Sequence, residues 1–159
     1  LLLLGSPMAT QIVTFIGGGQ MAQALAGGAI AAGVLTAEQL LFVEPSQAQQ
    51  QHLRSRFAGC RVTEQLSQGV AAATRLVLSV KPHIVRELAA ELAGLLQPQH
   101  LLVSIAAGIS LGTLQSLLGT KRVVRVMPNT PATSWGLRAT TTTSARAATF
   151  ALPSAARTP

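Results

Sequence analysis

The segment that most constrains the fold is residues 16–22, Ile-Gly-Gly-Gly-Gln-Met-Ala, which fits the pattern G-x-G-x-x-G/A. In this pattern Gly17 permits a tight turn out of a strand, and Gly19 lets the backbone approach a ligand closely because it has no Cβ atom. Ala22 takes the third small position, where a helix packs closely on the strand. The pattern is informative only where a strand precedes it and a helix follows it.

The flanking segments meet both conditions. Residues 11–16 are apolar and rich in β-branched side chains, which predicts a buried strand. Residues 20–32 carry Ala, Leu and Ile at helical spacing, and Gly33 is placed to end that helix. The free N–H groups and the dipole at a helix start attract anions, so the segment predicts a pyrophosphate site. The alternative is a glycine turn with a purely structural role.

The same alternation of strand and helix continues to residue 126. Further strands are predicted at 40–43, 61–63, 76–80, 101–105 and 122–126. Helices are predicted from a Ser46 cap to about residue 57, and at 64–73, 84–96 and 110–118. Alternating β and α segments form parallel sheets covered on both faces. The predicted fold class is therefore α/β, a Rossmann-type doubly wound parallel sheet.

Composition narrows the remaining possibilities. The chain has 159 residues, of which 48% are hydrophobic, and no apolar run reaches the roughly 20 residues that span a membrane. Cys60 is the only cysteine, which excludes an internal disulfide and argues against a metal cluster. The net charge is +7, but the basic residues form no run and the chain has no Tyr, so nucleic-acid binding is not expected. With a single cysteine, no metal site is expected either.

Three segments are expected along the chain. Residues 1–7 are expected to be a leader or tag remnant, with Met8 as the natural start. Residues 8–131 are expected to form the dinucleotide-binding domain. Residues 132–159 contain four consecutive threonines and no acidic side chain, so we expect a poorly ordered tail, from a frameshift or an alternative splice.

Glu44 ends the second predicted strand, 22 residues after Ala22. In dinucleotide-binding folds a carboxylate at this point hydrogen-bonds the ribose hydroxyls and disfavours a 2′-phosphate. Taken alone, Glu44 predicts NAD rather than NADP. The alternative is a solvated residue at a strand end.

Four motifs, in order and at similar spacing, resemble the pyrroline-5-carboxylate reductase family, over about residues 8–131. They are residues 15–22 (Phe-Ile-Gly-Gly-Gly-Gln-Met-Ala), 79–83 (Ser-Val-Lys-Pro-His), 103–109 (Val-Ser-Ile-Ala-Ala-Gly-Ile) and 125–131 (Arg-Val-Met-Pro-Asn-Thr-Pro). The resemblance implies an enzyme that reduces 1-pyrroline-5-carboxylate to L-proline with NADPH or NADH.

The glycine loop and the resemblance together give a set of expected cofactor contacts. They are Ile16, Gly17, Gly18, Gly19, Gln20, Met21, Glu44, Ser79, Val80, Lys81, Pro82, Ala106, Ala107, Gly108 and Asn129. Asn129 is also a possible substrate contact, although a capping role in its two-proline turn is an alternative. Lys81 has the alternative of a surface lysine. His83 and His52 are assigned packing or solvated roles and no part in catalysis.

The sequence departs from the family pattern at several points. Glu44 replaces a small hydroxyl residue that often accepts the 2′-phosphate, and Leu66 replaces an Asn that often contacts the cofactor. Thr74-Arg75 replaces Asp-Val. The choice between NADP and NAD therefore stays open.

The resemblance ends at Pro131. In the family a helical C-terminal domain follows, which supplies the homo-oligomer interface and most contacts to the cyclic imine substrate, so catalytic residues cannot be named and the chain alone is expected to be inactive. The alternatives are a non-catalytic dinucleotide-binding fragment that pairs with full-length subunits, and another reductase with a similar cofactor domain. A cytoplasmic location is expected, with a mitochondrial one as the alternative, although no transit peptide is evident.

Overall fold

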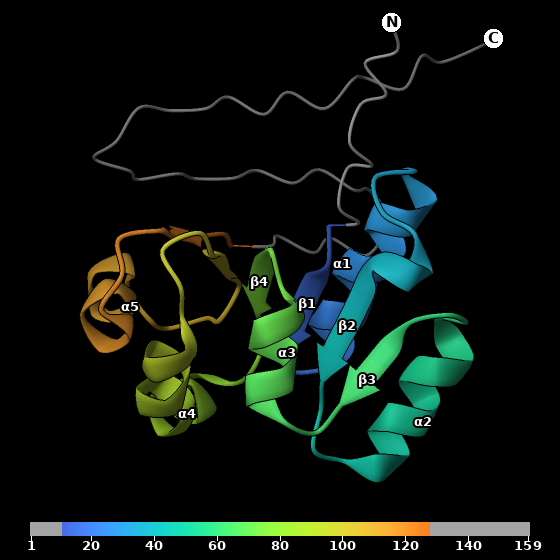
Figure 1. Ribbon diagram of the computed structural model, residues 1–159, viewed down its shortest axis with the longest axis horizontal. Helices are drawn as coiled ribbons and strands as arrows, with labels where there is room; N and C mark the ends of the chain where they lie inside the picture. Colours follow the sequence, from blue (N-terminus) through green and yellow to red (C-terminus); the bar gives the residue numbers. More distant parts are fainter. Residues whose placement is uncertain (1–10, 128–159) are drawn as a thin grey trace, which may run out of the picture.

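The computed structural model describes residues 11–127, and these form one six-stranded sheet with helices on both faces (Figure 1). The strands are β1 (Val13–Ile16), β2 (Leu40–Val43), β3 (Arg61–Thr63), β4 (Arg75–Leu78), β5 (Leu101–Ser104) and β6 (Val123–Arg125). The α-helices are α1 (Gln20–Ala31), α2 (Gln47–Arg56), α3 (Leu66–Ala72), α4 (Pro82–Leu95) and α5 (Leu111–Leu118), and a 3₁₀ turn spans Ala37–Gln39.

The sheet is entirely parallel, with the strand order β3-β2-β1-β4-β5-β6. β1 lies at the centre, where Val13 pairs with Leu40 of β2 on one side and with Arg75 of β4 on the other. The order reverses at β1, which creates a crevice at the carboxyl ends of β1 and β4. The predicted doubly wound α/β sheet is therefore confirmed.

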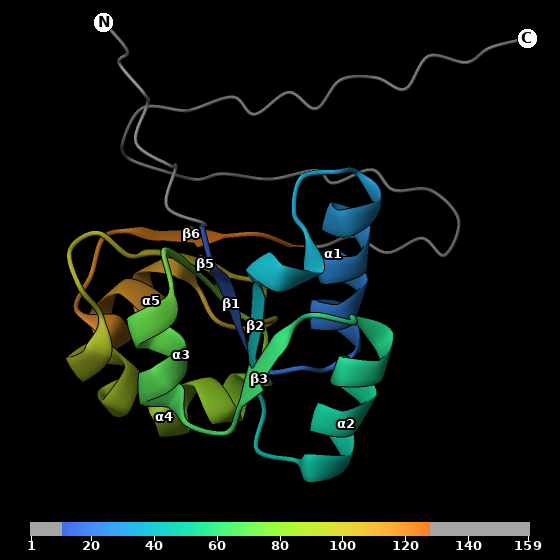
Figure 2. The ribbon, with the colours of Figure 1, turned by 45° about the vertical axis from the view of Figure 1, so that its right-hand side comes forward.

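Two separate hydrophobic cores hold the layers together. On one face α3, α4 and α5 pack against the sheet around Leu76, Leu78 and Leu102. On the other face α1 and α2 cover Phe15, Phe42 and other side chains that point the opposite way along the strands. Figure 2 shows these helix layers on either side of the sheet. The strands are short and apolar because each is covered on both sides.

The helix ends follow the predicted capping residues. The Ser46 hydroxyl accepts the Gln49 N–H at the start of α2, and the Ser110 hydroxyl accepts the Thr113 N–H at the start of α5. Gly33 has a φ of +68° immediately after the end of α1, as expected for a residue that terminates a helix. Residues next to the helices therefore set where α2 and α5 begin and where α1 ends.

Four predicted boundaries were wrong by two residues. The strand predicted from residue 11 begins at Val13, and the helix predicted from residue 64 begins at Leu66. The other two boundaries have a physical reason. The strand predicted at 76–80 ends at Leu78. The Ser79 N–H still donates to Ile16 O, but the neighbouring strand β1 ends at Ile16 and the chain turns at Gly17, so no strand continues beside Ser79 and Val80. The helix predicted at 84–96 begins at Pro82, because proline lacks an N–H and its fixed φ suits the first helical position. The expectations for residues 1–7, for Asn129 and for residues 132–159 lie outside the described residues.

The helix–sheet contact at Gly69 gives a stability prediction. A Cβ atom on Gly69 in α3 would collide with Val43 Cγ2 and lie 3.3 Å from Thr14 Cγ2. Gly69→Ala is therefore expected to lower the free energy of unfolding by about 1–3 kcal/mol, measured by urea denaturation. Gly94→Ala in α4 is the matched control: its Cβ meets nothing within 4 Å, so a gain of about 0.5 kcal/mol is expected. Equal effects of the two substitutions would contradict the packing described here.

Candidate functional site at the carboxyl edge of the sheet

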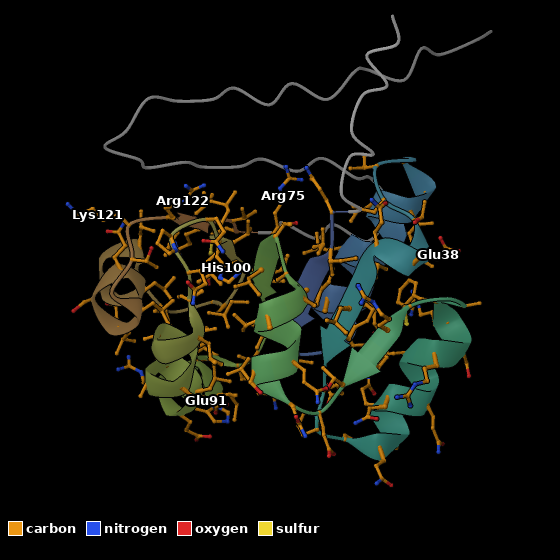
Figure 3. All side chains as sticks on the ribbon, in the orientation of Figure 1. Glu38, Arg75, Glu91, His100, Lys121 and Arg122 are labelled. Carbon is orange, nitrogen blue, oxygen red and sulfur yellow. The ribbon has the colours of Figure 1, made fainter. Side chains whose placement is uncertain are left out.

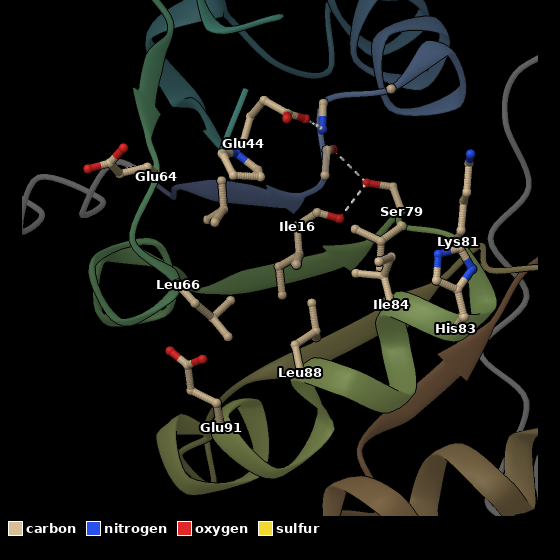
Figure 4. Close-up of a pocket in the computed structure, with 16 residues that line it drawn as sticks. Ile16, Glu44, Glu64, Leu66, Ser79, Lys81, His83, Ile84, Leu88 and Glu91 are labelled. Atoms are coloured by element: carbon tan, nitrogen blue, oxygen red, sulfur yellow. Dashed lines mark hydrogen bonds between the residues drawn. The ribbon is translucent and has the colours of Figure 1, made fainter. Parts of the chain in front are cut away.

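A cleft of about 530 Å³ lies at the carboxyl ends of β1, β2 and β4 (Figure 4). Its walls come from the glycine loop, the end of β2, the start of α3 and one face of α4. The lining residues are Ile16, Gly17, Gly18, Gly19, Val43, Glu44, Pro45, Glu64, Leu66, Ser79, Val80, Lys81, His83, Ile84, Leu88 and Glu91. This is the crevice where open α/β sheets bind ligands.

Gly17 makes the turn out of β1 in a conformation that favours glycine. Its φ is +99°, and a Cβ atom would lie 2.7 Å from Val80 Cγ1 and 3.0 Å from the Ser79 carbonyl oxygen. Its N–H donates to the Val43 carbonyl at 2.9 Å, which extends the β1–β2 pairing by one bond. Both the backbone angle and the close contact with Ser79 and Val80, which follow β4, therefore require glycine at position 17.

Ser79 fastens the other side of this turn. Its hydroxyl lies 2.9 Å from the carbonyl oxygens of Ile16 and of Gly17 (Figure 4), while its N–H donates to Ile16 O at 2.9 Å. One hydroxyl hydrogen is thus shared between two carbonyl groups of the loop. Ser79 holds the glycine turn on the end of β4, and its oxygen keeps acceptor capacity toward the cleft.

Gly18 is held by side chains from two helices and one strand end. Its N–H donates to Glu44 Oε2 at 3.0 Å, and its carbonyl accepts the side-chain amides of Gln23 at 2.9 Å and Gln49 at 2.8 Å. A Cβ at Gly18 would lie 2.5 Å from Leu53 Cδ1. The middle residue of the loop is therefore fixed from three directions.

The start of α1 leaves donors facing open space. Gly19 is the N-cap residue, and a Cβ built on it meets nothing within 4 Å. Among residues 11–127 no acceptor takes the Gly19 N–H, and Gln20 and Met21 follow in the first helical turn, where N–H groups have no intrahelical partner. These donors and the helix dipole suit an anionic group.

Charge is unevenly distributed along the cleft. Glu44, Glu64 and Glu91 line its walls on the side of β2 and the far end of α4, whereas Lys81 and His83 stand at the start of α4 (Figure 4). Other basic side chains, Arg75 and Arg122 among them, lie at the opposite, amino edge of the sheet (Figure 3). The cleft thus has a carboxylate-rich part and a cationic part.

Glu44 has a defined position within the carboxylate-rich part. In addition to Gly18 N–H, its carboxylate accepts the Ser46 N–H on Oε1 at 3.0 Å, next to the start of α2. A carboxylate has about four acceptor positions, so two remain for another donor. The side chain is therefore preorganised, with acceptor capacity left toward the cleft.

The structure brings together most of the predicted contact residues. Ile16, Gly17–Gly19, Glu44 and Ser79–Lys81 line the cleft, whereas Gln20, Met21, Pro82 and residues 106–108 do not. Residues 106–108 lie nearby at the end of β5, where a Cβ on Gly108 would contact Pro82 Cγ at 4.0 Å.

Sequence reasoning missed one wall of the cleft and the supports of the loop. Ile84, Leu88 and Glu91 share one face of α4 and line the cleft. Their spacing of four and three residues is a signal that could have identified this face. Gln23 was also missed, because its contacts with the loop and with α2 leave no local pattern in the sequence.

No helix within residues 11–127 combines the length and the apolar character needed to span a membrane. In the same part of the chain, no three His, Cys, Asp or Glu side chains are grouped closely enough to hold a metal ion.

Comparison with known proteins identifies the family. The family model described as "NADP oxidoreductase coenzyme F420-dependent" matches residues 12–108. A curated pyrroline-5-carboxylate reductase of Pseudomonas aeruginosa is 44% identical over 126 residues, 79% of this chain and 45% of that protein. The chain therefore belongs to this family of oxidoreductases, and the curated relatives that it matches are named pyrroline-5-carboxylate reductases.

Solved structures agree with this assignment. The pyrroline-5-carboxylate reductase of Coxiella burnetii superposes with a TM-score of 0.70 at 33% identity, over 77% of this chain and 45% of that one. The Plasmodium falciparum pyrroline carboxylate reductase, solved with NADP bound, gives a TM-score of 0.65 at 28% identity, over 79% of this chain and 45% of that one. The chain spans less than half the length of the curated relatives it matches.

The pKa of the Cys60 thiol, next to Arg54 of α2, gives a testable prediction. Burial raises the pKa of its thiol, and the neighbouring Arg54 guanidinium offsets part of that rise. The thiolate is the reactive form, so the alkylation rate of Cys60 is expected to reach its midpoint at a higher pH than that of free cysteine. Iodoacetamide kinetics across a pH series measure this, since the chain has no other cysteine. A midpoint at or below that of the urea-unfolded chain would be inconsistent with desolvation as the main cause.

Proposed function

We propose that residues 11–127 are the dinucleotide-binding half of an enzyme that reduces 1-pyrroline-5-carboxylate to L-proline with NADH or NADPH. The observation that carries the proposal is the glycine turn between β1 and α1, which lies at the cleft in a chain whose relatives are pyrroline-5-carboxylate reductases. The imine substrate, a homo-oligomeric assembly and a cytoplasmic location are proposed from the family resemblance.

The residues of the cleft fit a dinucleotide. Gly17 and Gly18 let the loop pack closely on Val80 and Leu53, and a Cβ built on Gly19 would meet nothing within 4 Å, so the start of α1 is open to a ligand. Gly19, Gln20 and Met21 offer backbone N–H groups there to a pyrophosphate. Lys81 adds a positive charge at the same end of the cleft. Asn129 and residues 106–108 are proposed to lie toward the nicotinamide, since they follow the last two strands.

The chemistry divides between the cofactor and the protein. A bound reduced nicotinamide supplies the hydride that goes to the imine carbon, while the imine nitrogen takes a proton. The residues described here orient the dinucleotide: Ser79 and Gly17 fix the turn, and the start of α1 binds the charged linkage. Catalysis at this half is therefore a matter of position and electrostatics.

Glu44 is proposed to select NADH. Its free acceptor positions suit the hydroxyl groups of the adenine ribose, whereas a 2′-phosphate there would face the charges of Glu44 and Glu64. No lysine or arginine is among the residues that line this part of the cleft within the described range. The NADP in the Plasmodium falciparum structure shows what that protein binds, and it does not decide the choice for this chain.

Calorimetric titration of the chain with NADH and with NADPH, in one buffer, tests both the binding of a dinucleotide and the preference for NADH. Saturable binding of either dinucleotide is expected, with NADH binding at least about tenfold more tightly, which is about 1.4 kcal/mol. Absence of binding by both would overturn the assignment of the cleft. Proline formation from the imine, measured together with NADH oxidation, distinguishes a catalytic chain from a dinucleotide-binding fragment.

The specificity role of Glu44 is tested by Glu44→Ser. The substitution removes the charge that disfavours a 2′-phosphate, so the ratio of the NADPH and NADH dissociation constants should fall by about tenfold. The ratio is the proper readout because Glu44 also holds the Gly18 N–H, whose loss weakens both complexes. Glu38→Ser, remote from the cleft lining, is the control and should leave the ratio unchanged. An unchanged ratio in Glu44→Ser would exclude this role.

A further inference from the structure

The Gly18 carbonyl group is held from the side of the molecule away from the cleft. The carboxamide of Gln23 in α1 and that of Gln49 in α2 both donate to it, at 2.9 and 2.8 Å. Two donors on one carbonyl oxygen use both of its lone pairs. The direction of the Gly18–Gly19 peptide group is therefore set by side chains that do not line the cleft themselves.

Fixing this carbonyl also fixes the next amide. The peptide bond is planar and trans, so the Gly18 C=O and the Gly19 N–H point in opposite directions. Because Gln23 and Gln49 hold the oxygen, the Gly19 N–H is aimed away from them, and Gly19 lines the cleft. The Gly19 N–H is one of the donors that the proposed function assigns to the pyrophosphate.

Gln23 is itself held in one orientation. It is 1% exposed, and its Oε1 atom lies 3.1 Å from Arg56 Nη1 and 3.2 Å from His52 Nε2. A guanidinium group can only donate and a carbonyl can only accept, so Oε1 must face Arg56 and Nε2 must face Gly18. If the Gln23 carboxamide were rotated by 180°, its NH₂ group would face the Arg56 guanidinium and its oxygen would face the Gly18 carbonyl.

One face of α2 thus supports the glycine loop. Gln49, His52 and Arg56 lie three and four residues apart, which places them on one side of the helix. Gln49 contacts the loop directly, whereas His52 and Arg56 contact it through Gln23. The exposed Arg56 is therefore connected to the glycine loop by two successive hydrogen bonds, from Arg56 to Gln23 and from Gln23 to the Gly18 carbonyl.

We infer that Gln23 is a positioning residue, which together with Gln49 aims the Gly19 N–H at the dinucleotide pyrophosphate. This inference rests on the proposed function. It adds that part of the dinucleotide affinity resides in side chains outside the cleft, on the hidden side of the loop.

Gln23→Glu separates positioning from folding. The carboxylate keeps the volume and retains a partner in Arg56, but it places an oxygen against the Gly18 carbonyl where an N–H stood. The dissociation constants for NADH and NADPH are expected to rise at least about tenfold, and equally, because both share the pyrophosphate. The melting temperature is expected to fall, because a buried carboxylate oxygen then faces the Gly18 carbonyl, but the chain should stay folded at the assay temperature because the contact with Arg56 persists.

A matched control adds the same charge elsewhere. Gln51→Glu lies on the exposed side of α2, so it changes the net charge equally without touching the loop. It should leave both dissociation constants unchanged. If Gln23→Glu binds dinucleotides as the parent does, or loses affinity no more than Gln51→Glu, the inference is wrong.

Two further measurements keep the result interpretable. Should Gln23→Glu fail to fold, Gln49→Met decides: it removes the other donor on a half-buried helix position and should also weaken both dinucleotides. Backbone NMR of the ligand-free chain gives an independent readout, since Gln23→Glu should move the Gly18 and Gly19 amide signals. If the parent chain binds no dinucleotide, the proposed function fails. The NMR comparison still tests the positioning role: Gly18 and Gly19 signals that do not move in Gln23→Glu would refute it, and signals that move would support it.

Discussion

The close approach of the Gly17–Gly18 turn to the ends of β2 and β4 is the contact on which the site depends. The Gly17 N–H bonds Val43 O, and the turn packs against Ser79 and Val80 so tightly that no Cβ fits at position 17. This contact brings the start of α1 to the crevice where the strand order reverses. Without it, the N–H groups of α1 would not face the same cleft as Glu44 and Lys81.

Polar side chains stabilise this region where apolar packing cannot. The two cores hold the helix layers on the sheet, but the loop between them consists of backbone groups that need partners once buried. Ser79, Glu44, Gln23 and Gln49 supply those partners. The groups left without partners at the start of α1 are the ones open to a ligand, so the hydrogen-bond pattern supports the proposed binding surface.

Much of the fold was predictable because its signals are local. Apolar runs predicted five of the six strands, and the sixth, Arg61–Thr63, was predicted from a weaker pattern. Ser46, Ser110 and Gly33 predicted helix ends, since each residue acts on backbone within a few positions. The 3₁₀ turn Ala37–Gln39 was not predicted, because it is a single short turn in a loop. The end of β4 at Leu78 was missed because it depends on the turn at Gly17 that ends the neighbouring strand β1, 62 residues before Ser79.

The part of the candidate site that depends on local sequence was also predictable. The glycines, Glu44 and Lys81 follow strand ends or precede helices, so the sequence order alone places them at one edge of the sheet. Gln23 was not recognisable, because its partners His52 and Arg56 come from α2, 29 and 33 residues further along the chain. Contacts of this kind depend on how two helices pack, which no local pattern encodes.

The central claim is that the turn from β1 to α1 binds the pyrophosphate of a dinucleotide. Its most direct test is backbone NMR of the ¹⁵N-labelled chain during addition of NADH. The largest shift changes are expected at the amides of Gly17 to Met21, with little change at Arg75 and Arg122 on the opposite edge of the sheet. Shift changes that leave the glycines unmoved and gather elsewhere would contradict the account.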